Sequence, residues 1–432
     1  MTREDAHSVS SSTGRAGALG LQARASTTTA RVSTPRDRQL LRWLYRSMGT
    51  PPFSIRLWDG YEVGGEAGDE LARVIIHNRR ALWRLIANPE LHFGDDYAAG
   101  LVEVEGDLTS LLTEAYERMQ ATLANRPWQQ ALMRVLNLPR RNTLQGSKSN
   151  IHHHYDLGNA FYALWLDERM QYTCAYYADP EASLEQAQLA KLDHVCRKLR
   201  LQPGDRVVEA GCGWGGLALH MANAYGCHVR AYNISREQVD YAQQRAATEG
   251  LGDRLAYIED DYRNIEGEYD VFVSVGMLEH VGLKNYSTLG GVIDRCLTAD
   301  GRGLIHTIGR NAPNHLNLWI ERRIFPGAYP PTLAQMGAIF EPYRFSIQDV
   351  ENLRLHYART LQHWYDRFSA RREQVLTWFD ESFFRAWELY LLGSKSGFVS
   401  GSLQLFQIVF TRDQNNALPW SRDHMYPEAR DA

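Results

Sequence analysis

Residues 207–216 read VVEAGCGWGG, a short apolar run that ends in an acid and continues into four closely spaced glycines. The run predicts a buried strand. The glycines predict a tight turn into a helix, where the missing side chains let backbone N–H groups approach a ligand. Gly211, Gly213 and Gly216 also satisfy the GxGxxG spacing of dinucleotide-binding proteins, so the loop alone does not identify its ligand.

The segments around this loop alternate between short apolar runs and helical patterns. Helices are expected in 214–226 and 235–250, and strands in DRVVEAG, HVRAYN, RLAYIE, YDVFVSVG and GLIHTIG. Short apolar strands separated by helices predict an α/β fold in which helices cover both faces of a mostly parallel sheet. The alternating run SLQLFQIVFTR at 402–412 is expected to supply the closing strand.

Two polar residues favour S-adenosylmethionine over a nicotinamide dinucleotide at the glycine loop. Glu209 ends the first strand, where a carboxylate can meet the cationic methionine part of that cofactor but would repel a pyrophosphate. Asn233 ends the second strand, where a nicotinamide site would have an acid for the ribose hydroxyls. The sequence therefore predicts an S-adenosylmethionine site.

Composition narrows the class of protein. A net charge of -4 and a pI near 6.4 do not favour a nucleic-acid partner, and 44% apolar residues can fill a sizeable core. The five cysteines are scattered without CxxC spacing, which favours a reducing cytoplasm over a disulfide framework or a zinc cage. No run is long enough to span a bilayer and no signal peptide is evident, so any membrane contact is expected to be peripheral.

The chain divides by composition into five segments. A Ser-, Thr- and Arg-rich tail is expected at 1–36, with an organellar transit peptide as the alternative. A small α+β domain follows at 37–135, and a Pro-, Gly- and Ser-containing linker at 136–150. The glycine loop belongs to the main domain, 151–415, and 416–432 is expected to be a C-terminal tail.

Several ordered motifs identify a family. Residues 151–177 (IHHHYDLGNAFYALWLDERMQYTCAYY), 274–286 (SVGMLEHVGLKNY), 303–311 (GLIHTIGRN) and 319–333 (WIERRIFPGAYPPTL) resemble the cyclopropane fatty acid synthase family, which includes the mycolic acid cyclopropane synthases. The resemblance covers roughly 40–412. It implies a Rossmann-like class I methyltransferase domain with a seven-stranded sheet, preceded by a small lipid-binding or dimerisation domain.

The resemblance also implies the chemistry. Such enzymes add a methylene from S-adenosylmethionine across a cis double bond of a phospholipid acyl chain, with bicarbonate as the base. An alkene is a weak nucleophile, so it must be held in line with the methyl donor in a dry, apolar slot. A weak oxyanion base then removes a proton from the new methyl group without trapping the carbocation.

The same resemblance implies the site residues. The bicarbonate cage would consist of Glu279, His306, Tyr357 and the backbones of Cys174 and Ile308, so Cys174 would be a cage wall and not a nucleophile. The expected cofactor contacts are Tyr172, Thr173, Glu209, Gly211, Gly213, Asn233, Gln238, Asp261 and Tyr262. The run 152–154 is three histidines, but without a carboxylate cluster it does not predict a metal site.

Some alternatives remain open. The same carbocation could yield a methylene- or methyl-branched chain, and a non-catalytic lipid-binding protein is a candidate from another class. The expected partners are unsaturated phospholipid chains at the inner face of a membrane and a second copy of the chain. Two N-terminal helical patterns could dock on anionic lipid or simply pack, and the residues concerned are Arg42, Trp43, Leu44, Arg46, Arg79, Arg80, Trp83, Arg84 and Leu85.

Overall fold

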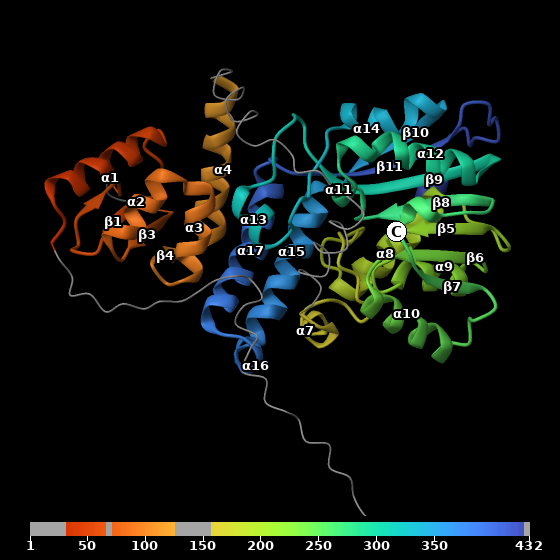
Figure 1. Ribbon diagram of the computed structural model, residues 1–432, viewed down its shortest axis with the longest axis horizontal. Coiled ribbons are helices and arrows are strands. Elements are labelled where there is room, and N and C mark those ends of the chain that lie inside the picture. Colours follow the sequence, from red (N-terminus) through yellow and green to blue (C-terminus); the bar gives the residue numbers. More distant parts are fainter. Residues whose placement is uncertain (1–31, 66–70, 126–156, 427–432) are drawn as a thin grey trace, which may run out of the picture.

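The computed structural model describes residues 32–65, 71–125 and 157–426. Figure 1 shows a small sheet at one end of the molecule, a larger sheet at the other, and helices packed between the two. In the described part of the chain, no helix is both long and apolar enough to cross a membrane.

The larger sheet contains the glycine loop. Its strands are β5 (Arg206–Ala210), β6 (His228–Asn233), β7 (Leu255–Glu259), β8 (Tyr269–Val275), β9 (Leu297–Gly309), β10 (Phe345–Asn352) and β11 (Gln404–Arg412). They lie in the order β10-β11-β9-β8-β5-β6-β7, and the neighbours from β9 to β7 are all parallel. This arrangement confirms the predicted Rossmann-like α/β fold with a mostly parallel seven-stranded sheet.

Helices cover both faces of this sheet, because each helix has an apolar side that must be buried. One face carries α8 (Leu184–Lys198), α9 (Gly216–Ala224) and α10 (Arg236–Thr248), whose buried residues form one hydrophobic cluster with the strands. The other face carries α12 (Tyr286–Cys296) and α14 (Leu333–Phe340), which contribute to a second cluster. The short α11 (Leu278–Val281) follows β8 directly.

The last strand of the chain does not lie at the edge of the sheet. β11 is inserted between β9 and β10 and runs antiparallel to both. The excursion that brings the chain back consists of α15 (Arg354–Ala370), α16 (Arg372–Trp378) and α17 (Glu381–Val399). A strand buried between two neighbours explains why every position from Gln404 to Thr411 is buried.

The N-terminal unit is a small α+β layer. Its strands are β1 (Ser54–Leu57), β2 (Glu62–Val63), β3 (Ala72–Ile76) and β4 (Val102–Gly106), in the order β2-β1-β3-β4. Its helices are α1 (Pro35–Ser47), α2 (Arg79–Ala87), α3 (Pro89–Ala98) and α4 (Leu108–Asn125). The Thr34 side chain accepts a hydrogen bond from the Asp37 amide, and the Asp37 carboxylate accepts one from the Thr34 amide. This capping box fixes the start of α1.

This cap corrects one predicted boundary. Thr34 and Pro35 belong to the start of α1, so the predicted tail of 1–36 extends too far; the tail's remaining residues up to 31 lie outside the described part of the chain. The predicted linker, 136–150, lies outside it as well, as does the histidine run.

The predicted C-terminal tail is also packed where it is described. Met425 is buried, and its carbonyl accepts hydrogen bonds from His194 Nδ1 at 3.1 Å and from Arg197 Nε at 3.2 Å. Both donors belong to α8, so the chain up to residue 426 is part of the main domain and not a free tail.

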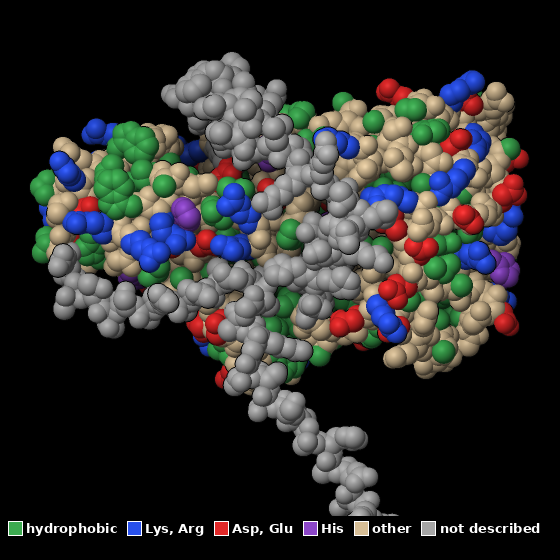
Figure 2. All heavy atoms as spheres, viewed as in Figure 1, with side chains coloured by type: hydrophobic (Ala, Val, Ile, Leu, Met, Phe, Trp, Pro, Cys, Tyr) green, Lys and Arg blue, Asp and Glu red, His purple; other side chains and the backbone are tan. Residues whose placement is uncertain are grey.

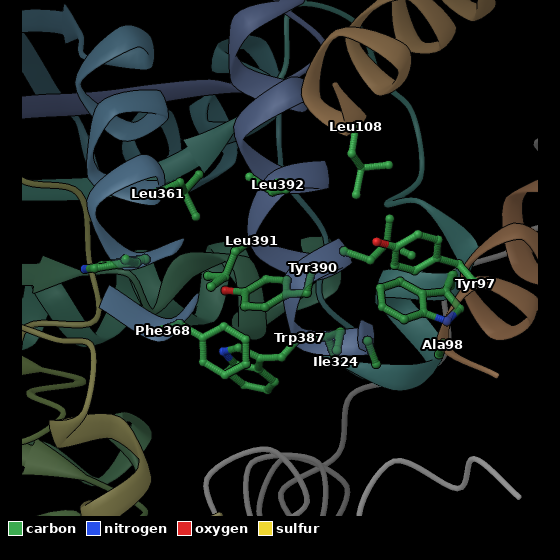
Figure 3. Close-up of a cluster of buried hydrophobic side chains, with 14 of the residues drawn as sticks. Tyr97, Ala98, Leu108, Ile324, Leu361, Phe368, Trp387, Tyr390, Leu391 and Leu392 are labelled. Carbon is green, nitrogen blue, oxygen red and sulfur yellow. The ribbon is translucent and has the colours of Figure 1, made fainter. Parts of the chain in front are cut away.

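The N-terminal unit and the main domain share one hydrophobic core. Figure 3 shows Tyr97 and Leu108 of the N-terminal helices in one cluster of buried side chains with Tyr390, Leu391 and Leu392 of α17. The Tyr97 hydroxyl donates to Glu388 at 2.8 Å, which adds a polar contact across the same junction. A further helix, α13 (Leu318–Arg323), packs against α3, so two helices of the main domain complete the core of the first unit.

Candidate active site

The glycine loop has the backbone that its sequence predicts. Gly211 has a φ of +84°, and a Cβ placed on it would lie 2.8 Å from the Cβ of Met277. Gly215 has a φ of +79°, and its Cβ would lie 2.5 Å from the Tyr257 ring. A side chain at either position would therefore close the space at the start of α9 or strain the turn.

All nine residues predicted to contact the cofactor line one pocket. It lies beyond the carboxyl ends of β5, β6, β7 and β8, where parallel α/β sheets place their ligands. Its open space is about 1100 Å³. Asn233 helps to order the pocket, because its amide donates to Gly213 O at 3.1 Å and to Gln238 Oε1 at 2.8 Å.

Glu209 lies at the base of this pocket. Its side chain is buried, and no described residue hydrogen-bonds Oε2. Burial raises the pKa of Glu209 to about 8, and the nearby charge of Lys191 opposes that rise. An unpartnered buried carboxylate oxygen beside a glycine cradle fits the cationic methionine end of S-adenosylmethionine.

Lys191 is a residue of this pocket that the sequence analysis missed. It projects from α8, its Nζ hydrogen-bonds Gln171 Oε1, and it donates to Thr173 Oγ1 at 3.0 Å. Burial lowers the pKa of Lys191 to about 8. The available signal is that Lys191 falls on the buried side of α8 with Ala187 and Val195, where a charge needs a partner.

The predicted cage begins with Glu279, on α11. Its Oε1 accepts from the Ile308 amide at 2.5 Å, while Oε2 is buried and has no hydrogen-bond partner among the described residues. Burial raises the pKa of Glu279 to about 7. The Ile308 amide thus orients Glu279, and the predicted contact of the Ile308 backbone with bicarbonate stays a prediction.

His306 lies two residues before Ile308 on β9. The Gln407 amide nitrogen is 3.1 Å from its Nδ1, and because an amide nitrogen only donates, Nδ1 accepts and the ring proton is on Nε2. Burial lowers the pKa of His306 to about 3, so the ring is neutral at physiological pH. Nε2 is therefore a buried N–H donor with no partner in the described structure.

Cys174 and Tyr357 meet at the start of α15. The Cys174 thiol donates to Ala175 O at 3.1 Å and lies 3.9 Å from Leu353 O, and the Tyr357 amide donates to the same Leu353 carbonyl. Burial raises the pKa of Cys174 well above its usual range, so it stays a thiol and is a poor nucleophile. The Tyr357 ring stacks on Phe398 with centroids 4.6 Å apart.

Backbone bonds join the two halves of the cage. The Leu353 amide donates to Leu405 O, and Leu405 is paired with Ile308 between β11 and β9. Four segments that are distant in sequence therefore converge on one buried region, and their roles in binding an anion stay a prediction.

The fold and the pocket are those of the S-adenosylmethionine-dependent methyltransferases. A family model described as mycolic acid cyclopropane synthetase matches residues 142–408, and a model described as a domain of unknown function matches 40–127. The chain belongs to the mycolic acid cyclopropane synthetase family. It is therefore an S-adenosylmethionine-dependent methyltransferase, and not the non-catalytic lipid-binding protein that the sequence left open.

Individual relatives agree. The chain is 35% identical over 387 residues to a probable fatty acid methyltransferase of Pseudomonas putida, covering 87% of this chain and 96% of that one. It is 42% identical over 270 residues to cyclopropane-fatty-acyl-phospholipid synthase of Escherichia coli K12, covering 62% and 69%. The solved mycolic acid cyclopropane synthase CmaA1, complexed with SAH and CTAB, is 29% identical with a TM-score of 0.58, covering 61% and 98%.

Proposed function

We propose that this enzyme transfers a methylene group from S-adenosylmethionine to a cis double bond of phospholipid acyl chains, as a cyclopropane-fatty-acyl-phospholipid synthase. The observation that carries the proposal is the cage: two unpartnered buried polar atoms, Glu279 Oε2 and His306 Nε2, on segments that adjoin the cofactor pocket. Glu279 follows the lining residue Met277 by two positions, and the amide of the lining residue Gly276 donates to His306 O. The Escherichia coli relative of that name supports the substrate class.

Aromatic side chains keep the region beside the pocket dry. Tyr172, which lines the pocket, packs against Trp165 and Trp364 with ring centroids 5.3 Å apart in both pairs. Its hydroxyl lies 2.6 Å from the hydroxyl of Tyr390 on α17, which fixes the ring. A rigid apolar wall of this kind can position an alkene, which offers no polar group to hold.

The cage residues fit bicarbonate. S-adenosylmethionine, when bound, supplies the methyl group, and bicarbonate supplies an acceptor for the proton that this group loses. The neutral His306 donates from Nε2, ionised Glu279 accepts at Oε2, and the family resemblance adds Tyr357 to the cage, so the chain's own part is to hold a weak base in a fixed place.

A direct experiment uses vesicles of two phosphatidylethanolamines that differ only in one cis double bond. Release of S-adenosylhomocysteine should require the unsaturated lipid, and the product chain should gain the mass of one CH₂ unit. Equal release with the saturated lipid would contradict the substrate assignment, whereas the absence of release with both would contradict the activity.

A branched product is the second candidate. It is favoured by the Pseudomonas putida relative and by tuberculostearic acid methyltransferase UfaA1 of Mycobacterium tuberculosis, which is 34% identical over 392 residues, covering 86% of this chain. Mass spectrometry before and after catalytic hydrogenation under mild conditions distinguishes the candidates. A methylene branch takes up hydrogen readily and a ring resists it, whereas a methyl-branched chain is heavier than either by two hydrogen atoms before hydrogenation.

We further propose that the enzyme works as a homodimer in the cytoplasm at the inner face of the membrane. The proposal is supported by the family resemblance and by the need to reach acyl chains within a bilayer. Sedimentation of the full chain with and without vesicles tests both parts.

A further inference from the structure

The N-terminal unit contains a large apolar cavity that the proposed function does not use. It has a volume of about 410 Å³ and shares no lining residue with the cofactor pocket. Its walls include Phe53, Val74, Phe93 and Leu112 of the N-terminal unit, and Trp319 of α13 closes it from the main domain. Protein interiors are normally close-packed, and an empty apolar space of this size is costly, which indicates an apolar ligand.

One wall of the cavity adjoins a basic surface. Ser47, at the end of α1, lines the cavity and also a shallow hollow on the outer side of the helix, formed with Gln39, Arg42, Trp43 and Arg46. The cavity and the hollow therefore meet at one residue.

The charges around the hollow are almost all of one sign. Apart from Asp37, arginines are the only charged residues of α1 and α2, and Asp37 is buried and paired with Arg79 at 2.6 Å. Arg36, Arg42, Arg46 and Arg80 are exposed and form no ion pair with any residue that the structure describes. In a chain of net charge -4, this is a local site for an anion.

Two tryptophans complete the surface. Trp43 is 57% exposed and Trp83 is 50% exposed, whereas Leu85, which the sequence grouped with them, is buried. Figure 2 shows hydrophobic and basic side chains side by side over the N-terminal unit. Exposed tryptophan beside arginine is the composition of proteins that rest at the headgroup level of a bilayer.

We propose that the cavity and the adjoining Arg42–Trp43–Arg46 surface form a second lipid site, in which an acyl chain enters the cavity at Ser47 and an anionic headgroup lies against the arginines. The site goes beyond the proposed function, because it binds lipid away from the cofactor pocket and requires no double bond. It would give the N-terminal unit, which matches a domain of unknown function, a defined ligand.

The chain offers a variant that fills the cavity. Gly393 lines it from α17, and a Cβ placed there would lie 3.8 Å from Leu112 Cδ1 and 4.0 Å from the Tyr116 hydroxyl, both ordinary contacts. Gly393→Leu therefore places its side chain in the open space without strain, and it should also raise the melting temperature by improving the helix.

The test uses vesicles that contain phosphatidylglycerol with a saturated, diazirine-labelled acyl chain, which cannot undergo the methyl-transfer reaction. After irradiation, mass spectrometry should find adducts on residues of α1, α4 and α17 that line the cavity. In Gly393→Leu these adducts should fall about tenfold, the effect of displacing two buried methylenes, while labelling elsewhere persists. Because the probe is saturated, the result does not depend on whether the proposed reaction is correct.

A charge variant tests the headgroup contact and remains informative if Gly393→Leu fails to fold. The double variant Arg42→Glu, Arg46→Glu should lose most cavity adducts, whereas the control Arg230→Glu, Arg254→Glu, with the same charge change at exposed arginines of the main domain, should keep them. Wild-type protein without cavity adducts, or cavity adducts that neither variant reduces, would overturn the proposal. If the Arg42→Glu, Arg46→Glu variant lost no more cavity adducts than the control variant, the proposed contact between the headgroup and the arginines would be contradicted.

Discussion

Two buried glutamates lie beyond the ends of neighbouring strands, and their surroundings differ. Glu209, on β5, has the cation of Lys191 near it, whereas Glu279, after β8, is held by the neutral amide of Ile308. Burial raises the pKa of both, to about 8 and about 7, and each keeps one oxygen without a partner among the described residues.

The difference teaches how one sheet edge can serve two tasks. Glu209 contributes its charge to a cationic ligand. Lys191 lies near Glu209 and holds the segment of Gln171 and Thr173 in place by hydrogen-bonding both residues. The cation of a bound ligand favours the ionised form of Glu209, whereas Glu279 has no cation beside it and changes its protonation near pH 7, which suits a group that must accept a proton or a hydrogen bond during the reaction. Each prediction below tests this contrast.

The largest effect is expected for Glu279→Gln. The amide keeps the shape but loses the anionic acceptor, so kcat should fall about 100-fold or more, as for loss of a positioned base, while cofactor affinity stays near wild type. Steady-state turnover and a cofactor-binding isotherm measure the two quantities. Glu237→Gln, an exposed change on α10, is the control.

The wild-type rate should also fall when bicarbonate is removed and recover when it is returned. If Glu279→Gln turned over like the wild type and the wild-type rate did not depend on bicarbonate, another base would be acting.

Glu209→Gln should weaken cofactor binding more than turnover, which is the opposite of the result expected for Glu279→Gln. Loss of a charge-assisted contact to the cationic methionine end should weaken cofactor binding about 30-fold, with a smaller change in kcat at saturating cofactor. Calorimetric titration with S-adenosylmethionine measures the affinity. If kcat fell as steeply as for Glu279→Gln while affinity held, the two carboxylates would share one task and the contrast would be lost.

The pH dependence should follow Glu279. With a pKa of about 7, Glu279 is ionised above that pH and protonated below it, and only the ionised form can accept the proposed hydrogen bond. At saturating substrates kcat should therefore rise through pH 7 and fall about tenfold per unit well below it. His306, with a pKa of about 3, stays neutral across this range and adds no step. A flat profile from about pH 5.5 to about pH 8, the range in which histidine and raised carboxyl groups titrate, would contradict the assignment.

The smallest effect is expected for Cys174→Ala. The thiol is fully buried and is not needed as a nucleophile, so turnover should stay within about threefold of wild type and the melting temperature should fall slightly. A folded, cofactor-binding variant without turnover would restore a covalent role for Cys174.

Much of this could be predicted from the sequence, and the exceptions have physical causes. The resemblance supplied all nine cofactor positions, and six of them lie at or just after the ends of β5, β6 and β7, where strand patterns can place them: Glu209, Gly211, Gly213, Asn233, Asp261 and Tyr262. Tyr172 and Thr173 come from a loop before α8 and Gln238 from α10, which only the family motifs connect to the pocket. Lys191 was missed because its partners, Gln171 and Thr173, come from a loop that no periodicity connects to α8. The resemblance implied a role for the Ile308 backbone in the cage, and only the fold reveals that Glu279 accepts from the Ile308 amide.

The N-terminal region was less predictable. The helical patterns that include Trp43 and Trp83 fold as α1 and α2, but the sequence gives no sign that Glu388 and Leu392 of α17 complete a core that begins near Leu41. Local pattern identifies an apolar face; it does not tell which distant helix will cover that face.

That shared core has a consequence for synthesis. The first unit leaves the ribosome with its apolar side open, and the helix that covers it, α17, is made about 250 residues later, which at usual rates of translation is roughly ten to fifty seconds. During that interval the N-terminal unit cannot complete its native packing. The apolar side of the N-terminal unit therefore stays exposed until α17 has been synthesised, and a chaperone that binds apolar surface could protect it during this interval.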